Sequence, residues 1–527
     1  MKSRYWNRDT KVRLDLARSV TATTRAARAE SPEPGERGVE VSPWRRWPEM
    51  TIALCLPLMY LPALVLTYGL KDDYTYLAGA HGYTGAGTGE PGFSIRLGRP
   101  LFGILTAGLN STLPGIGFLG VARALSVVGL VLFGLVLYRA LVPLVRTPMS
   151  GVLIVLFICS MPPFLVYAGW ATLFSAPYSA ALGALGAVAA ARAADASRRE
   201  RTRWLALGNL LLLVALAIYQ PTAMAFWLVA LIVALSRRHS PELLPRLLRH
   251  VALVAAPPMV GAYLMLKIGV WTLGAAGAQR AGLLSNLTAK LHWIPEPLGL
   301  SLNLFNMPQS ALVAVVVGCA VVGGALLFAR DCKGRTRTMI LLLAAVAVPL
   351  SFAPNLLSQE NYATFRTVGP LTATFALLTA LLFVAVERDG TGAWRRLVGR
   401  GGLLVLTAVS VALGFNHLRT LIALPQSREW HLVLSQAARL PLQPSVVGFL
   451  APTFEEGPIT TRYGVRDEFG VPTSASTWAD PALTWLAARQ TGRVSGPNLK
   501  VLVVVGRGAK LVPGLPDIDM RDLRRLR

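Results

Sequence analysis

The chain alternates long apolar runs with short basic stretches, and this alternation constrains its fold more than any other feature. A helix of roughly 20 apolar residues is long enough to cross the hydrocarbon core of a bilayer. The first such run, residues 51–70, carries no charge. Charged residues make up 15% of the 527 residues, whereas a soluble chain contains about 25%. The pattern therefore predicts an all-α polytopic membrane protein.

Further runs bring the predicted number of transmembrane helices to about eleven by this length criterion. These runs are residues 117–138, 151–167, 177–191, 205–219, 223–235, 251–270, 311–329, 339–352, 370–386 and 402–418. The motif Tyr219-Gln220-Pro221-Thr222 separates two of them, which form either one helix kinked at Pro221 or two short helices. The sequence favours two helices, because basic loops flank the pair on both sides and two helices preserve the alternation of the loops.

Lysine and arginine are concentrated in every second loop. The basic loops are residues 139–146, 192–203, 237–249, 330–337 and 388–400. Because basic loops stay in the cytoplasm, we expect a multi-pass protein of the cell (plasma) membrane with a cytoplasmic amino terminus. The net charge of +25 is spread over short runs between apolar segments. We therefore predict membrane lipids and no nucleic acid as partners.

This topology divides the chain into three parts. Residues 1–50, with eleven Lys or Arg among the first 47, are expected to form a disordered basic cytoplasmic tail. Residues 51–424 are the predicted transmembrane core. Its predicted outer loops are residues 71–115, 271–310 and 353–369. Residues 425–527 include the strand-like segment 499–505 and are expected to form a small C-terminal α/β domain on the extracytoplasmic side.

Two adjacent carboxylates, Asp72 and Asp73, follow the first apolar run in the stretch "KDDYTYL". Like charges side by side at a membrane boundary are unfavourable unless they are solvated or used. One interpretation is a polar helix end that marks the lipid boundary. The other is a functional site, which the long glycine-rich loop after the acids favours, because a simple helix connection needs fewer residues.

Arginines lie on the side of the membrane where basic residues are otherwise scarce. Arg96 and Arg99 follow the acids, and Arg366 precedes a later span. Arg366 is either a snorkelling anchor or a ligand for an anion. Arg123, near the outer end of the second span, either snorkels or lines the same cavity. The coincidence of acids and arginines on one face favours a site for a phosphate and a hydroxyl group.

Three short motifs carry a family resemblance. They are Asp72-Asp73-Tyr74, Gly98-Arg99-Pro100-Leu101 and Tyr219-Gln220-Pro221. In this order the chain resembles the bacterial O-antigen glucosyltransferase II family, which belongs to the C-type (GT-C) superfamily of polytopic glycosyltransferases. The resemblance covers roughly residue 51 to the last span. It implies a GT-C-like core, a sugar donor linked to polyprenyl phosphate, and a cell-envelope glycan or glycolipid acceptor.

The resemblance implies that an aspartate of the first outer loop acts on the acceptor hydroxyl, a role that falls to Asp72 or Asp73. A base of this kind contributes about 10²–10⁴-fold to a rate. Cations must also stabilise the charge that grows on the departing phosphate, and we assign this role to Arg99 and Arg366, with Arg96 nearby. The expected substrate contacts are Tyr74, Tyr76, Tyr219, Gln220, Glu360 and Asn361.

No cofactor is predicted. The second aspartate could orient the base, bind a sugar hydroxyl or help to hold a divalent ion, but a single carboxylate pair does not predict a required metal. The four cysteines show neither metal-ligand nor disulfide spacing.

The alternative function is a transporter or flippase for a lipid-linked sugar, which would place acids or broken helices near the bilayer midplane. A third interpretation is a non-catalytic envelope scaffold whose C-terminal domain binds a partner.

Overall fold

The computed structural model describes most of the chain from residue 46 onward. The described residues are 46–85, 91–240, 242–274, 282–307, 311–332, 334–389, 392–454, 468–506, 508 and 513–521. The chain divides between Trp47 and Pro48. The predicted basic tail lies outside the described residues as far as residue 45, and the predicted loop 271–310 does so in part.

Seven helices in the described part of the chain are long and apolar enough to cross a membrane, or eight if one bent pair forms a single span. They are α7 (Leu119–Leu141), α10 (Ala176–Asp195), α11 (Arg198–Ala223), α13 (Leu243–Leu273), α16 (Ala311–Ala329), α19 (Gly369–Asp389) and the continuous helix of α20 (Ala393–His417), the π-helical η5 (Leu418–Ala423) and α21 (Leu424–Ala437). Each coincides with a predicted run. The polytopic membrane class is thus confirmed, and the number of about eleven spans is not.

The other four predicted runs form shorter or broken helices. These are α2 (Trp47–Met59) with α3 (Leu61–Val65), α8 (Pro148–Cys159) with α9 (Pro162–Gly169), α12 (Ala225–Ser236) and α17 (Gly334–Leu350). Helices α8 and α9 meet at an angle of 66°, and Pro162 and Pro163 open the second of them. Proline has no N–H to donate to the preceding turn, so an apolar run that contains it need not form one straight helix.

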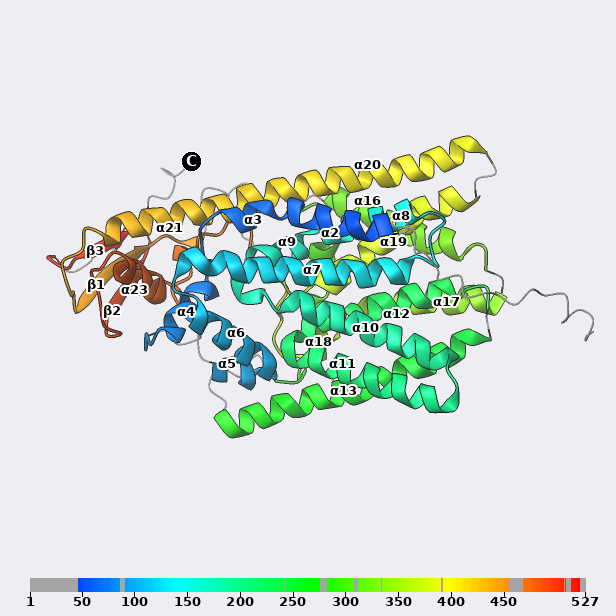
Figure 1. Cartoon of the computed structure of the whole chain (residues 1–527), viewed down its shortest axis with the longest axis horizontal. Coiled ribbons are helices and arrows are strands. Elements are labelled where there is room, and N and C mark those ends of the chain that lie inside the picture. The colour runs from blue at the N-terminus through cyan, green and yellow to red at the C-terminus, as the bar shows by residue number, and fades with distance from the viewer. Residues whose placement is uncertain are drawn as a thin grey trace, which may run out of the picture. The chain divides into compact units, whose positions relative to one another are not determined.

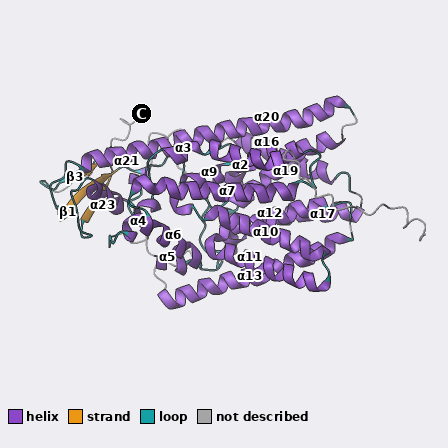
Figure 2. Ribbon diagram, in the orientation of Figure 1, coloured by secondary structure: helices purple, strands orange, loops and turns teal. Residues whose placement is uncertain are grey.

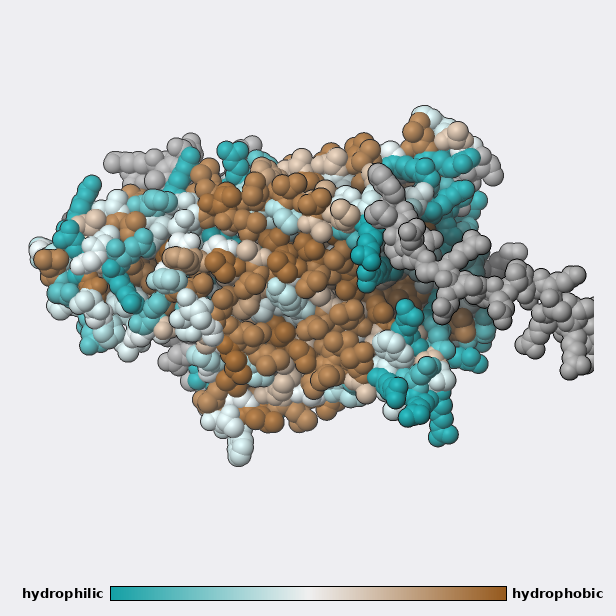
Figure 3. Space-filling model, in the orientation of Figure 1, coloured by the Kyte–Doolittle hydropathy of each residue, from teal (hydrophilic) through white to brown (hydrophobic). Residues whose placement is uncertain are grey.

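Helix α10 packs against α7, α11, α12 and α13 (Figure 1). It is rich in alanine and glycine, and a Cβ atom added to Gly183 would overlap the carbonyl oxygen of Ala223. Small residues therefore let these helix backbones approach closely. Figure 3 shows a broad hydrophobic surface over the helical region, with hydrophilic residues on either side of it. Such a surface is expected of helices that face lipid.

The helices that connect the long spans are short. They are α4 (Asp72–Ala80), α5 (Pro91–Arg96), α6 (Pro100–Thr112), α14 (Leu287–Trp293), α15 (Pro295–Leu302) and α18 (Ala353–Leu357), with the 3₁₀ turns η2 (Ile116–Phe118) and η3 (Ala171–Leu173). A further 3₁₀ turn, η7 (Thr473–Ala475), lies in the C-terminal region. Several of these elements surround the cavity described below.

The C-terminal region contains a small parallel sheet (Figure 2). Its strands are β1 (Val446–Ala451), β2 (Lys500–Val505) and β3 (Asp517–Asp519), in the order β2-β1-β3. Helix α23 (Asp480–Gln490) connects β1 to β2 and packs on both α21 and α4. The ring of Tyr83, just after α4, stacks on Trp485 with centroids 5.2 Å apart. The sheet region thus shares a hydrophobic core with the segment that follows the first apolar run.

Candidate active site

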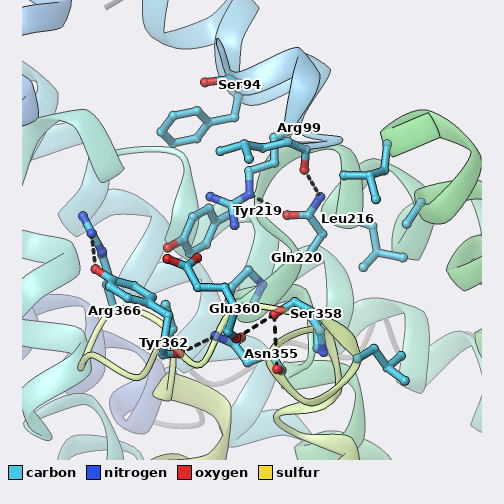
Figure 4. Close-up of a pocket in the computed structure, with 18 of the residues that line it drawn as sticks. Ser94, Arg99, Leu216, Tyr219, Gln220, Asn355, Ser358, Glu360, Tyr362 and Arg366 are labelled. Atoms are coloured by element: carbon cyan, nitrogen blue, oxygen red, sulfur yellow. Dashed lines mark hydrogen bonds between the residues drawn. The ribbon is translucent and has the colours of Figure 1, made fainter. Parts of the chain in front are cut away.

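A cavity of about 300 Å³ lies among the short helices α4, α5, α6 and α18, the turn η3 and the long helices α11 and α13. Figure 4 shows polar side chains converging on it from segments far apart in the sequence. The charged side chains in its lining are Asp72, Arg99, Glu360 and Arg366. The remaining wall is largely apolar and aromatic, so the charged groups lie in a partly non-aqueous environment that strengthens their interactions.

Asp72 opens helix α4 and faces the cavity. One carboxylate oxygen, Oδ2, lies 3.7 Å from Nη1 of Arg366, and the two side chains are 31% and 16% exposed. The other oxygen, Oδ1, accepts a hydrogen bond of 3.3 Å from the indole N–H of Trp478. The Asp72 carboxylate is therefore accessible from the cavity and lies beside a cation, so it can accept a hydrogen bond or a proton from a group bound there.

Arg366 is held by aromatic groups as well as by acids. Its guanidinium lies over the rings of Trp170, at 4.6 Å, and Tyr362, at 5.6 Å. It also donates a hydrogen bond to the hydroxyl of Tyr362. Glu468 accepts a bond of 3.3 Å from the backbone N–H of Arg366. Planar stacking and cation–π attraction fix a guanidinium in one orientation, which suits the recognition of an anion.

Arg99 enters the cavity from the opposite wall and is oriented by Gln220. Its Nε donates to Oε1 of Gln220 at 2.6 Å, and the guanidinium lies 4.6 Å from the centre of the Tyr219 ring. The Gln220 amide in turn donates to the carbonyl of Gly98 at 2.8 Å. The motifs around Gly98-Arg99 and Tyr219-Gln220 are thus one hydrogen-bonded unit.

Local backbone geometry explains two of these residues. Tyr219 has non-helical angles (φ −154°, ψ 100°) inside α11, two residues before Pro221, where proline removes a helical hydrogen bond. Gly98 has φ +71°, and a Cβ atom there would lie 3.2 Å from the backbone of Leu266. Only glycine adopts this conformation without strain, so the turn before Arg99 requires it.

Asp73 does not line the cavity, because its side chain points into the protein. It is fully buried, and its carboxylate accepts hydrogen bonds from the backbone N–H groups of Leu70, Ala171 and Thr172 and from the Thr172 hydroxyl. Burial raises the pKa of Asp73 to about 6, although the bonds from Thr172 oppose this shift. The residue fastens the start of α4 to η3.

The other residues singled out from the sequence divide in the same way. Tyr76 and Glu360 line the cavity. The Tyr76 hydroxyl lies 2.9 Å from Oγ of Ser94. Burial raises the pKa of Tyr76 to about 12, which keeps its phenol protonated. Tyr74 is buried against Trp430, and Arg96 donates to the carbonyl of Leu273. Tyr74, Arg96 and Asn361 do not belong to the cavity lining.

Arg123 neither snorkels nor lines the cavity. It is 1% exposed and donates to the carbonyls of Ala63, Leu66 and Tyr68 at distances of 2.6, 2.9 and 2.8 Å. Helix α3 ends at Val65, so the carbonyls around this end need partners from elsewhere. Arg123 supplies those partners and shapes the loop that leads to Asp72.

Sequence reasoning did not identify Thr172, Glu468 or Trp478. Each contacts Asp72, Asp73 or Arg366 from a distant part of the sequence, so the contact exists only in the folded protein. The segment "DEFGVPTSASTW" contains Glu468 and Trp478 but has no spacing that indicates a mechanism.

The fold and the cavity define a class: a polytopic membrane protein with two acids and two arginines in one cavity between its helices. Residues 85–388, more than half of the chain, match the family model described as glucosyl transferase GtrII. The chain belongs to this family of membrane glucosyltransferases, which confirms the resemblance to the O-antigen glucosyltransferase II family. A search of curated proteins found no match. The family match begins after Asp72 and ends before the C-terminal region.

Proposed function

We propose that the protein transfers a glucosyl residue from a polyprenyl-phosphate donor to a cell-envelope glycan or glycolipid on the extracytoplasmic face of the plasma membrane. The observation that carries this proposal is the shared cavity of Asp72, Arg99 and Arg366. A base and two cations around one space match the two needs of glycosyl transfer, which are removal of a proton from the acceptor and stabilisation of the leaving phosphate.

The donor phosphate lies between Arg99 and Arg366 in this proposal. As the bond between the sugar C1 and the phosphate oxygen breaks, the bonding electrons go to that oxygen, and the two guanidiniums stabilise the added negative charge. Gln220 and Tyr362 orient the guanidiniums. Because both arginines are held before the substrate arrives, little reorganisation is needed at the moment of reaction.

The polyprenyl chain of the donor requires an apolar surface. The apolar part of the lining includes Leu97, Leu216, Met259, Ala262 and Leu266. Several residues of α13 on either side of this wall are exposed on the surface of the bundle, among them Val260 and Leu264. A lipid tail beside α11 and α13 would therefore pass from the cavity to the bilayer without burying polar groups in the lipid.

Asp72 acts as the base. An acceptor hydroxyl forms the new bond to C1 and gives its proton to the Asp72 carboxylate, while the polyprenyl phosphate leaves. Asp73 positions α4 and does not touch the substrate in this scheme. Tyr76 and Glu360 are placed to bind sugar hydroxyls, Tyr76 as a donor because its phenol is protonated.

The orientation in the membrane rests on the basic loops. The proposal places the loop 192–203 in the cytoplasm and the start of α4 outside. In a cysteine-free background, a membrane-impermeant thiol reagent added to intact cells should label Thr84→Cys and leave Arg199→Cys unlabelled. The reverse labelling pattern would place the cavity on the cytoplasmic side and refute the orientation.

The activity is tested by incubating purified protein with polyprenyl-phosphate [14C]glucose and envelope glycan from cells that lack the protein. Asp72→Asn should lower transfer by about 10²–10⁴-fold while the protein remains folded. Asp331→Asn, which changes an exposed acid outside the cavity lining, is the matched control and should be as active as the wild type. Full activity of Asp72→Asn would reject Asp72 as the base. A wild-type protein that moves the donor across vesicles without transfer or hydrolysis would be a carrier instead.

A further inference from the structure

The C-terminal segment 468–478 reaches the charged end of the cavity, although the family match ends at residue 388. Glu468 lies 3.9 Å from Nε of Arg366, and the indole N–H of Trp478 lies 3.3 Å from Oδ1 of Asp72. Residues of a region outside the family match thus contact both members of the Asp72–Arg366 pair.

This segment is fixed on α21. The backbone N–H groups of Thr473 and Ser474 donate to the Glu429 carboxylate at 2.9 and 2.7 Å, and the Thr473 hydroxyl donates to Gln426 at 2.8 Å. The same hydroxyl accepts the backbone N–H of Lys71 at 3.1 Å. The segment and the residue before Asp72 therefore share one buried hydrogen-bonded frame.

Trp478, like its neighbour Thr477, is accessible and so differs from the buried part of this frame. Its exposure is 43%, whereas Thr473, Ser474 and Ser476 are fully buried. The more exposed Trp271 and Trp394 lie near the ends of the long helices α13 and α20, where membrane proteins commonly carry tryptophan. Trp478 instead lies on a loop after η7, with its indole edge on the acid that serves as the base.

We propose that Trp478 is the platform of the acceptor subsite, and that the acceptor is a carbohydrate whose sugar ring packs on the indole face and presents a hydroxyl to Asp72. This inference rests on the proposed function. The indole has an apolar face for the C–H side of a sugar and a polar edge that holds the carboxylate. A ring seated on that face lies beside Oδ1 of Asp72, the atom that takes the proton when the hydroxyl attacks C1.

The donor and acceptor then approach from different parts of the chain. The family-matched helices α11 and α13 provide the apolar wall for the donor, and the C-terminal region provides the surface for the acceptor. The C-terminal region would accordingly determine which acceptor glycan is used.

Three substitutions separate a platform from a contact that only positions Asp72. Trp478→Gln keeps an N–H donor without an aromatic face, Trp478→Phe keeps an aromatic face without the N–H, and Trp478→Leu keeps neither. The assay is the transfer from polyprenyl-phosphate [14C]glucose to envelope glycan from cells that lack the protein, with both substrates varied. Trp394→Ala, which removes an exposed indole at the start of α20, is the control.

The platform predicts a roughly tenfold higher KM for the acceptor in Trp478→Gln and Trp478→Leu. Trp478→Phe should stay within about threefold of the wild type, and the KM for the donor should change in none of the variants. An unchanged KM for the acceptor in Trp478→Gln overturns the subsite. Equal losses of kcat in Trp478→Phe and Trp478→Leu, together with wild-type kinetics in Trp478→Gln, overturn it as well, because the N–H group alone would then matter. A wild-type protein that neither transfers nor hydrolyses the donor overturns the proposed function itself, and no Trp478 variant is needed to see that result.

Discussion

The replacement Arg123→Met removes the group that holds the loop before Asp72. Arg123 is buried on α7 and donates to three carbonyls of the segment 63–68, and its guanidinium lies 4.0 Å from the centre of the Tyr68 ring. Methionine fills similar space but donates no hydrogen bond. The carbonyls at the end of α3 would therefore lose their partners, and the backbone that places Asp72 would be released.

The cost follows from the burial of these bonds. The bonds to Ala63 and Tyr68 are buried, whereas the bond to Leu66 is partly accessible and its carbonyl can bind water. Leaving two buried acceptors unpaired costs about 1–3 kcal/mol each. Methionine also carries no charge, so the free energy that burying the Arg123 charge costs is no longer needed, and this offsets part of the loss. The free energy of unfolding should accordingly fall by about 2–4 kcal/mol, a large part of the typical 5–15 kcal/mol.

Thermal unfolding of the detergent-purified protein measures this loss. Arg139→Met is the matched control, because Arg139 lies on the same helix in an exposed ion pair with Glu49 at 3.0 Å, and such pairs contribute about 0–1 kcal/mol. Arg123→Met should melt well below this control, with Arg123→Lys between the two because one ammonium cannot reach all three carbonyls. If Arg123→Met and Arg139→Met melt together, the three bonds do not hold the loop.

Two further outcomes are expected. The pKa of Asp73 is raised from 3.8 to about 6 by burial, so between these values this carboxyl binds more protons in the folded protein than in the unfolded chain. Its contribution to the free energy of unfolding should fall by up to about 3 kcal/mol as the pH rises from 4 to 6. Asp73→Asn should remove this contribution from the slope in thermal melts and leave that of Glu429, which is also buried, and of Asp480, whose pKa burial also raises. Gly98→Ala should lower the free energy of unfolding by about 1–2 kcal/mol because alanine is strained at the positive φ. It should also raise the KM for the donor, because Gly98 accepts the hydrogen bond from Gln220, which orients Arg99. Gly108→Ala is the control and should change neither quantity, because there is open space around Gly108.

The sequence predicts where the chain is apolar better than how its helices bend. Run length locates the seven long spans, including α16 at residues 311–329. It does not reveal that residues 151–167 form two helices at 66°, because proline tolerates several continuations of an apolar run and tertiary packing selects one of them.

The sequence also groups Asp72, Arg99 and Arg366 on one side of the membrane, and these residues do line one cavity. It does not distinguish Asp72 from Asp73. Successive residues of a helix point about 100° apart, since 3.6 residues complete a turn, and the sequence gives no reference direction. The fold supplies that direction when Ala171 and Thr172 bind Asp73. The role proposed for Trp478 depends on a contact across 406 positions, which no local pattern contains.

Two adjacent acids are compatible at this site because each has a separate environment. Asp73 is surrounded by hydrogen-bond donors and cannot be reached from the cavity, whereas Asp72 faces Arg366 and the accessible Trp478. Lys71, directly before them, has the uncommon φ of 42° and donates its N–H to Thr473. A strained residue persists only when its surroundings enforce it. The buried acid on one side and the C-terminal frame on the other therefore hold this turn together, and both fix the direction of the Asp72 side chain.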